Sequence, residues 1–106
     1  MSIGVPRIKD ANTETMTATG VLTAASAYHQ ILDPDGAREL DMPNGATTQG
    51  GRCVITNAAS GAEAITVKQS DSSTTIVVID QNESATLVCT GAGSTTGWQV
   101  VGITEA

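Results

Sequence analysis

Few side chains in this sequence could do chemistry, and their spacing does not form a recognisable reactive group. His29 is the sole histidine, and it follows Tyr28 in a predicted strand, where neighbouring side chains face opposite ways. Serine and threonine are abundant, but none lies in a Gly-x-Ser-x-Gly turn and no spacing pairs one with His29. The Gly-Ala-Gly-Ser stretch at 91–94 is too short for a phosphate-binding loop. We therefore predict no catalytic residue and expect no enzyme activity.

The Asp33-x-Asp35-Gly36 segment has the opening spacing of a calcium-binding loop. Such a loop needs a bidentate glutamate at its twelfth position, which here is Asn44. A tight turn explains the segment better, because proline presets φ, aspartate closes an Asx-type bond and glycine accepts a positive φ. We predict no bound metal and no cofactor.

Three further residues have both a structural and a functional interpretation. Cys53 and Cys89 lie in predicted strands at positions that alternate with core residues, which favours two buried thiols; a disulfide is the alternative. Zinc would need more ligands than the chain groups together. Trp98 could stack on a sugar ring, but a single tryptophan at the head of a terminal strand is better explained as a core anchor.

The acidic composition excludes several classes of partner. The chain has 106 residues and a net charge of −6, without a basic stripe that could follow a phosphate backbone, so we expect no nucleic-acid binding. No segment has the roughly 20 apolar residues that span a membrane, so we expect no membrane partner. Residues 1–4 lack the apolar run of a signal peptide, so we expect no export through the Sec route.

The second half of the sequence predicts a series of short strands. Each apolar run is closed by glycine, serine, asparagine, aspartate or threonine, which is typical of antiparallel strands joined by tight turns. The runs occupy residues 51–57, 64–69, 75–80, 84–90 and 98–101. Alternation places pairs of residues on a common face: Cys53 with Ile55, Ile65 with Val67, and Leu87 with Cys89. The run Ile76 to Ile79 is apolar on both faces, which predicts a strand covered on both sides by a second sheet or another subunit.

The first fifteen residues show no clean periodicity and predict an extended N-terminal arm (1–15) before a single β domain (16–106). Pro6 blocks early strand pairing, and residues 10–13 indicate a loop. Two interpretations stay open. The arm is a frayed terminus, or it orders against a neighbouring subunit, since Ile3, Val5 and Ile8 alternate as a strand-adding segment would.

Residues 16–42 complete the expected fold. Residues 16–23 predict a first strand with a glycine break, and residues 28–32 and 37–42 predict a hairpin around the turn at 33–36. No segment has the apolar stripe of a helix over three turns. We therefore predict an all-β protein: an antiparallel β-sandwich or β-barrel, jelly-roll-like, with seven or eight short strands.

A core with so few aromatic residues predicts self-association. Phenylalanine is absent, and Trp98 and Tyr28 are the only aromatic residues, so a symmetric oligomer would add stability. We expect a homotrimer ahead of a dimer. Val77 and Ile79, in the run that is apolar on both faces, are the candidate oligomer contact; the alternative is that they face an intrachain layer.

The stretch from Tyr28 to Gly102 resembles small β-structured virion proteins of tailed bacteriophages. The likeness lies in a strand ending Ile-Thr-Asn, then an Ile-Thr-Val-Lys strand, a Thr-Ile-Val-Val-Ile strand, an Asn-Glu-Ser-Ala-Thr-Leu-Val-Cys-Thr-Gly run and a terminal Gly-Trp strand. The arm and the absence of a fibre repeat make the chain most similar to head decoration proteins. The resemblance implies a protein made in the host cytoplasm and located on the capsid exterior, with the major capsid protein as its partner.

The resemblance also leaves an alternative, a trimeric head- or tail-fibre module that binds host-surface glycan. A decoration protein would clamp neighbouring capsid subunits through its arm, where Ile3, Val5, Arg7 and Ile8 are the candidate capsid contacts. A glycan-binding module would need Trp98 or Tyr28 exposed, with polar groups beside the ring.

Overall fold

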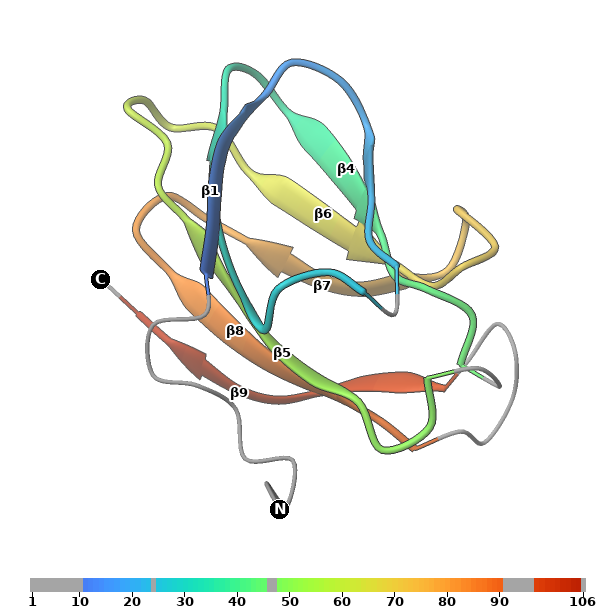
Figure 1. The fold of residues 1–106 in the computed structure, drawn as a ribbon. Coiled ribbons are helices and arrows are strands. Elements are labelled where there is room, and N and C mark those ends of the chain that lie inside the picture. Colours follow the sequence, from blue (N-terminus) through green and yellow to red (C-terminus); the bar gives the residue numbers. More distant parts are fainter. Residues whose placement is uncertain (1–10, 24, 46–47, 91–96, 106) are drawn as a thin grey trace.

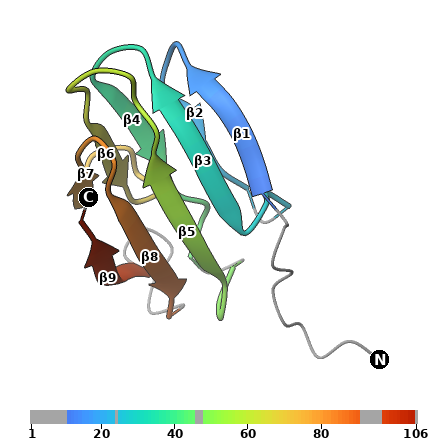
Figure 2. The same cartoon turned by 90° about the vertical axis from the view of Figure 1, so that its left-hand side faces the viewer.

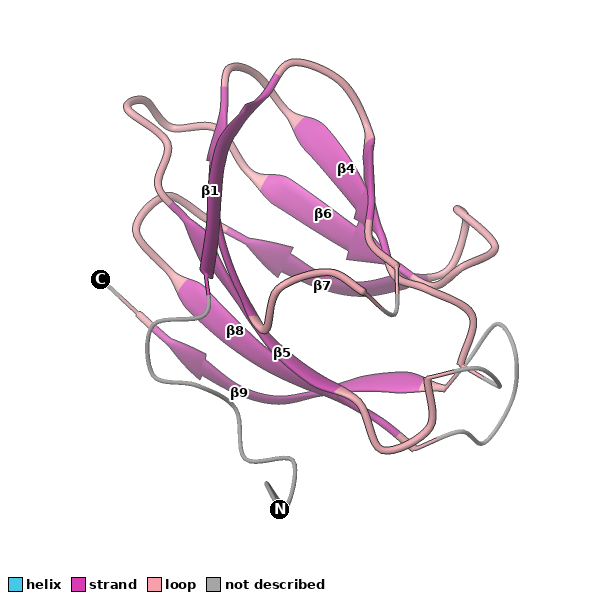
Figure 3. Ribbon diagram, viewed as in Figure 1, coloured by secondary structure: helices cyan, strands magenta, loops and turns pink. Residues whose placement is uncertain are grey.

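The computed structural model describes residues 11–23, 25–45, 48–90 and 97–105, and within these ranges it contains nine strands and no helix (Figures 1 and 3). No helix in this part of the chain is therefore long and apolar enough to cross a membrane. The all-β prediction is confirmed, although the strand number exceeds the seven or eight that we expected. The strands are β1 (Ala11–Met16), β2 (Gly20–Val21), β3 (His29–Pro34), β4 (Arg38–Asp41), β5 (Arg52–Asn57), β6 (Ile65–Lys68), β7 (Thr75–Ile79), β8 (Ser84–Cys89) and β9 (Trp98–Thr104).

The strands form two sheets with the apolar core between them. Sheet A has the order β1-β3-β5-β8-β9 and sheet B has the order β2-β4-β6-β7. Figure 2 shows β1, β3, β5 and β8 of sheet A side by side, with β2, β4 and β6 behind them. The first six strands alternate between the two sheets, so that the chain winds as a coil through both layers.

This winding makes two of the four strand pairs of sheet A and two of the three pairs of sheet B parallel, which corrects the antiparallel prediction. β1 pairs with β3 and β3 with β5 in parallel, as do β2 with β4 and β4 with β6. Parallel neighbours need a long return connection, and here the return passes through the opposite sheet instead of through a helix. Only the last strands pair antiparallel: β5 with β8, β6 with β7, and β8 with β9. The fold is thus a pair of mixed sheets.

The predicted hairpin of residues 28–42 is wrong for the same reason. Its first strand became β3 in sheet A, and its second became β4 in sheet B. The turn does reverse the chain direction, but its two sides bond to different neighbours. The backbone N–H of Asp35 donates to the oxygen of Met16, whereas the backbone N–H of Arg38 donates to the oxygen of Ala64. Turn residues encode the reversal, and they do not encode whether the second strand stays in the same sheet.

Two predictions about the N-terminal region also need correction. Residues 11–13 are not a loop, because β1 begins at Ala11. The predicted strand over residues 16–23 is replaced by the end of β1 and the two-residue strand β2. The remainder of the predicted arm, residues 1–10 with Ile3, Val5, Arg7 and Ile8, lies outside the described residues.

Small aliphatic and sulfur-containing side chains build the core, as the composition requires. The strands expected in the second half are all present as β5 to β9, and the paired faces predicted for β5, β6 and β8 are buried. Cys53 and Cys89 are both buried and free, which confirms the thiol interpretation. The core cluster comprises Met16, Leu32, Leu40, Met42, Cys53, Ile55, Ile65, Val67, Ile79, Ala85, Leu87, Cys89 and Trp98.

Strand β7 faces the core of its own chain. Ile79 has no exposed surface and pairs with the buried Ile65, and Val77 packs against the same cluster opposite Val67. Ile79 therefore follows the alternative prediction, in which this side of the strand faces a layer of the same chain. Its side chain is already enclosed and cannot be a subunit contact while the fold is intact. On the other face of this strand, Val78 is exposed.

Candidate binding surface along strand β9

The residues that could do chemistry are dispersed over the molecule. His29 forms a 2.8 Å hydrogen bond between its Nε2 and Oγ1 of Thr56, and Thr56 is 2.7 Å from Oγ of Ser84. This row crosses β3, β5 and β8 on sheet A. A nucleophile activated by histidine also needs a group that orients the ring, and no hydrogen bond from His29 to a carboxylate occurs among the described residues. The row is therefore best explained as a cross-strand hydrogen-bond ladder.

The acidic turn at Asp35 holds an ion pair and no metal cluster. Arg38 binds the Asp35 carboxylate with its guanidinium and also donates from Nε to the backbone oxygen of Met16 at 3.3 Å. Among the described residues, no group of three or more potential ligands could hold a metal ion. The pair instead fixes the turn that carries the chain from sheet A to sheet B.

Trp98 anchors the start of β9 in the core. The indole is only 5% exposed, and its Nε1 donates to the backbone oxygen of Pro43 at 2.9 Å. The side-chain amide of Gln69 bonds to both backbone groups of Trp98: Nε2 donates to the oxygen at 2.9 Å, and Oε1 accepts from the N–H at 3.3 Å. Gln69 follows β6, so this amide links sheet B to sheet A. The prediction that Trp98 is a core anchor is confirmed.

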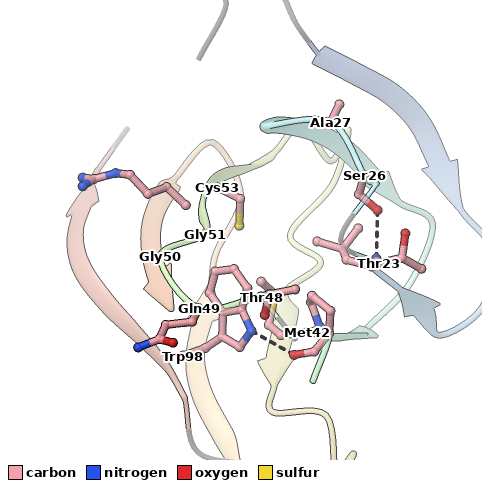
Figure 4. Close-up of a pocket in the computed structure, with 13 residues that line it drawn as sticks. Thr23, Ser26, Ala27, Met42, Thr48, Gln49, Gly50, Gly51, Cys53 and Trp98 are labelled. Atoms are coloured by element: carbon pink, nitrogen blue, oxygen red, sulfur yellow. Dashed lines mark hydrogen bonds between the residues drawn. The ribbon is translucent and has the colours of Figure 1, made fainter. Parts of the chain in front are cut away.

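A cavity of about 330 Å³ lies beside this indole (Figure 4). Its walls come from the loop after β2 and from the loop between β4 and β5, including Ser26, Met42 and Gln49. Gly51 belongs to the same wall, where an added Cβ would lie 2.8 Å from the Thr48 backbone oxygen and 3.3 Å from Cη2 of the indole. Glycine is therefore required for this loop to approach the tryptophan so closely. The cavity is at the lower end of the size range of ligand sites, and the indole beside it is only slightly exposed.

Beyond Trp98, strand β9 is exposed along its whole length. Val101 is 56% exposed, Ile103 is 44% exposed and Val100 is 36% exposed. From Trp98 to Thr104 the strand contains no charged residue and no proline, the residues that proteins use to blunt a free edge. β9 is the last strand of sheet A, so one side of its backbone has no neighbouring strand among the described residues (Figure 1).

The pairing of β9 explains why its apolar side chains stay exposed. Val100 lies opposite Leu87 and Ile103 opposite Ala85, and both of these β8 residues are fully buried. Paired residues share a face of the sheet, so Val100 and Ile103 lie on the core side. Sheet B ends at β7, which contacts β9, but both side chains stay partly exposed, so β7 does not cover them fully. The register shift at Thr86/Leu87 leaves Val101 as the extra residue of a bulge.

Three carboxylates lie at the far end of β9. Glu105 follows the strand directly, and Glu83 precedes Ser84, which pairs with Thr104. Asp80 begins the same turn and receives a hydrogen bond on its backbone oxygen from Glu83. The ion pairs of the described residues are Arg38–Asp35 and Lys68–Glu39, so none of the three carboxylates has a cationic partner there. This end of the strand is an acidic surface beside an apolar one.

A fourth carboxylate, that of Asp71, has a pKa that is lowered by hydrogen bonds within its own loop. The backbone N–H groups of Thr74 and Ser73 bond to Asp71 and, with the Thr74 hydroxyl, hold its pKa at about 2. Asp71 is fully exposed and orders the turn between β6 and β7. Its role is structural, and it does not belong to the surface along β9.

We call the β9 surface the residues Val100, Val101 and Ile103 together with the free backbone edge of β9. Such a surface can bind a protein by adding a strand and covering apolar side chains. The sequence predicted the strand and the buried position of Trp98, and it placed Val100 with the core. Val101 and Ile103 were missed, because the alternation of a strand does not show whether a second layer covers it.

No protein-family model matches this chain, and no curated protein sequence matches it.

Proposed function

We propose that this protein is a structural component of a tailed-phage virion, a decoration protein that binds the outer surface of the major capsid protein shell. The observation that carries the proposal is the uncovered apolar surface of β9. A protein that works alone in solution would bury Val101 and Ile103 or replace them with charged residues. A protein that works inside an assembly covers them with its partner.

The resemblance of residues 28–102 to small virion proteins supplies the identity of the assembly. The surface supports the same class of function, because strand addition and apolar contact need no reactive group. The arm residues Ile3, Val5, Arg7 and Ile8 stay a predicted contact of this assembly. The predicted trimer likewise stays a prediction.

The alternative, a fibre module that binds glycan, is weakened by the position of the two aromatic residues. Stacking on a sugar needs an accessible ring face. Trp98 is buried and held by Pro43 and Gln69, and Tyr28 is partly buried. The burial of both rings therefore weighs against this function and favours the decoration protein.

Binding to purified expanded capsids that lack the protein tests the proposal. We expect the wild-type chain to co-sediment with the capsids and Val101→Lys to bind more weakly, since lysine places a charge in the apolar contact. Val21→Lys is the matched control, because Val21 is also an exposed valine but lies in β2, an edge strand of the other sheet. A wild-type chain that binds host cells and not capsids would replace the proposal with the glycan-binding alternative.

Deleting Ser2 to Asp10 tests the arm in the same assay. The deletion leaves β1 intact, because this strand begins at Ala11. Weaker binding would support a role for the arm in the assembled shell. Undiminished binding would remove the arm from the mechanism.

A further inference from the structure

The free edge of β9 has the length and composition of a docking strand. Of the edge strands in the described residues, β9 has seven residues, β1 six, β7 five and β2 two. β1 is polar along its exposed part, and it buries its one large apolar residue, Met16. β9 holds three of the five large apolar residues that are exposed among the described residues. An extended segment with apolar side chains would therefore fit this edge better than any other edge.

The charge of the N-terminal segment complements this edge. Residues 1–9 contain two of the chain's five cationic residues, Arg7 and Lys9, and none of its eleven acidic ones. The rest of the chain thus has three cationic and eleven acidic residues, and two of those cations, Arg38 and Lys68, already have acidic partners. The end of β9 carries Asp80, Glu83 and Glu105 without a cationic partner in the described residues. A basic segment would be attracted to that end.

The N-terminal segment cannot pair with β9 of its own chain along its full length. Ala11, where β1 begins, lies in one row of sheet A with His29, Val54, Thr86 and Gly102. Four inter-strand steps separate Ala11 from β9, which is about 19 Å. At about 3.3 Å per residue, crossing this distance uses roughly six of the ten residues that precede β1. The remainder would not reach along the strand with Arg7 and Lys9.

We propose that residues Ile3 to Lys9 of one copy of this chain pair along the free edge of β9 in a second copy. The seven residues of this segment match the seven of β9 in length. In this register Val5 lies beside Val100 and Val101, and Lys9 lies beside Thr104, next to the carboxylates at the end of the strand. This order of side chains makes the added strand parallel to β9. Pro6 is compatible, because an edge strand tolerates a missing N–H on its outer side.

The pairing gives the arm a partner of defined chemistry, a second copy, and the capsid contact of the proposed function then belongs to the oligomer and not to a single copy. Each copy has one arm and one acceptor edge on opposite sides of sheet A, so the contact is heterologous. A heterologous contact closes into a ring or continues as a filament. A closed ring of three would agree with the trimer predicted from the sequence.

The first test measures the mass of the full-length chain by sedimentation velocity without capsid. We expect wild type to sediment as an oligomer at micromolar concentration. Deletion of residues 2–9 and the Val101→Lys variant should each sediment as monomers, and the control Val21→Lys should remain oligomeric. A monomeric wild type, or an arm-deleted chain that still associates, would overturn the proposal. The second result would point instead to an isologous contact between two β9 edges.

The second test mixes the two monomeric variants. The arm-deleted chain keeps an intact β9 edge, and the Val101→Lys chain keeps an intact arm, so the mixture should form a one-to-one heterodimer. Failure to form it would contradict the pairing. Circular dichroism of each variant checks folding, and Ile103→Lys replaces Val101→Lys if the latter does not fold. Because capsid is absent, these results do not depend on the proposed function.

Discussion

Asn57 shows how one polar side chain can join separate elements inside an apolar core. It is fully buried at the end of β5. Its Nδ2 donates to the backbone oxygens of Glu63 at 2.8 Å and Ile79 at 2.9 Å, and its Oδ1 accepts from the N–H of Ala59 at 2.9 Å. The side chain therefore ties the loop after β5 to the end of β7. A buried polar group is tolerated when all of its hydrogen bonds are made, and here each amide atom has a partner.

We expect Asn57→Ala to lower the free energy of unfolding by about 2–4 kcal/mol, because three buried backbone groups lose their partner. Chemical denaturation checks this value. Asn82→Gly is the matched control, since Asn82 is exposed and has a φ of 67°, a conformation that glycine adopts without strain. A loss for Asn57→Ala no larger than that of the control would refute the bonding role.

The Cys53 thiol predicts an alkaline loss of stability. Burial raises its pKa from 9.0 to about 12, so the folded chain keeps the proton over a range in which the unfolded chain releases it. The folded state then binds more protons, and stability falls as the pH rises from about 9 to about 12. The expected slope is roughly 1 kcal/mol per pH unit.

Comparing wild type with Cys53→Ala isolates this slope, since all other titrating residues are shared. The variant should lose some stability at neutral pH through its smaller side chain, and its stability should fall less steeply above pH 9. Equal slopes in denaturation curves measured across this range would show that the thiol does not contribute.

At the scale of elements, β9 has two parts with different support. Its first residue is enclosed by Pro43, Gln69 and the core, whereas its later residues pair with β8 and are exposed. Gln69 supplies the link from the opposite sheet. An amide side chain that bonds both backbone groups of one residue takes the place of a neighbouring strand. Gln69 therefore satisfies the backbone N–H and C=O of Trp98 from the opposite sheet.

We expect Gln69→Ala to release the start of β9 and to destabilise the protein by about 1–3 kcal/mol, because the buried N–H and C=O of Trp98 lose their partners. Hydrogen exchange of the β9 amides should rise, while exchange in β5 should not change. Trp98 fluorescence should shift toward that of a hydrated indole. Gln99→Ala, an exposed glutamine on the same strand, is the control and should leave both measurements unchanged.

The parallel pairing also belongs to the scale of elements. Strands β1 to β6 pass between the sheets at each turn, and the connections differ in length, so no fixed repeat is visible in the sequence. An antiparallel hairpin and a connection between two sheets both use a short polar turn. Asp35 and Gly36 mark such a turn, and its neighbours in space decide which of the two it becomes.

For the whole molecule, the separation of charge predicts how copies associate. Residues 1–9 are basic, and the rest of the chain is strongly acidic. At a salt concentration of 0.1 M, the attraction between exposed charges is largely screened beyond a distance of about 10 Å, and this distance shortens as salt increases. An arm that binds the acidic end of a neighbouring β9 should therefore bind more weakly as salt increases.

We expect the dissociation constant of the oligomer to rise with sodium chloride concentration, as measured by sedimentation. The double variant Arg7→Gln with Lys9→Gln should associate more weakly at low salt and should show a flatter salt dependence. Arg52→Gln is the control, because it removes an exposed cation that lies outside the arm. An association that strengthens with salt would indicate apolar contact alone.

The sequence by itself determined where the strands of the second half lie and which side chains of β5, β6 and β8 are buried. The strands from β5 to β9, the inward faces of β5, β6 and β8, the buried free cysteines and the anchored Trp98 were all predicted correctly. The physical reason is local: alternation of apolar and polar residues sets the faces of a strand, and turn residues set its ends.

Only the tertiary structure decided which strands are neighbours and in which direction. The sheet assignment of β3 and β4, the partners of Asn57 and Gln69, and the exposure of Val101 and Ile103 depend on segments far apart in the chain. An exposed valine and a core valine have the same sequence pattern in a strand. They differ only in whether another segment of the fold covers them, and at β9 the edge of sheet B leaves Val100 and Ile103 partly exposed.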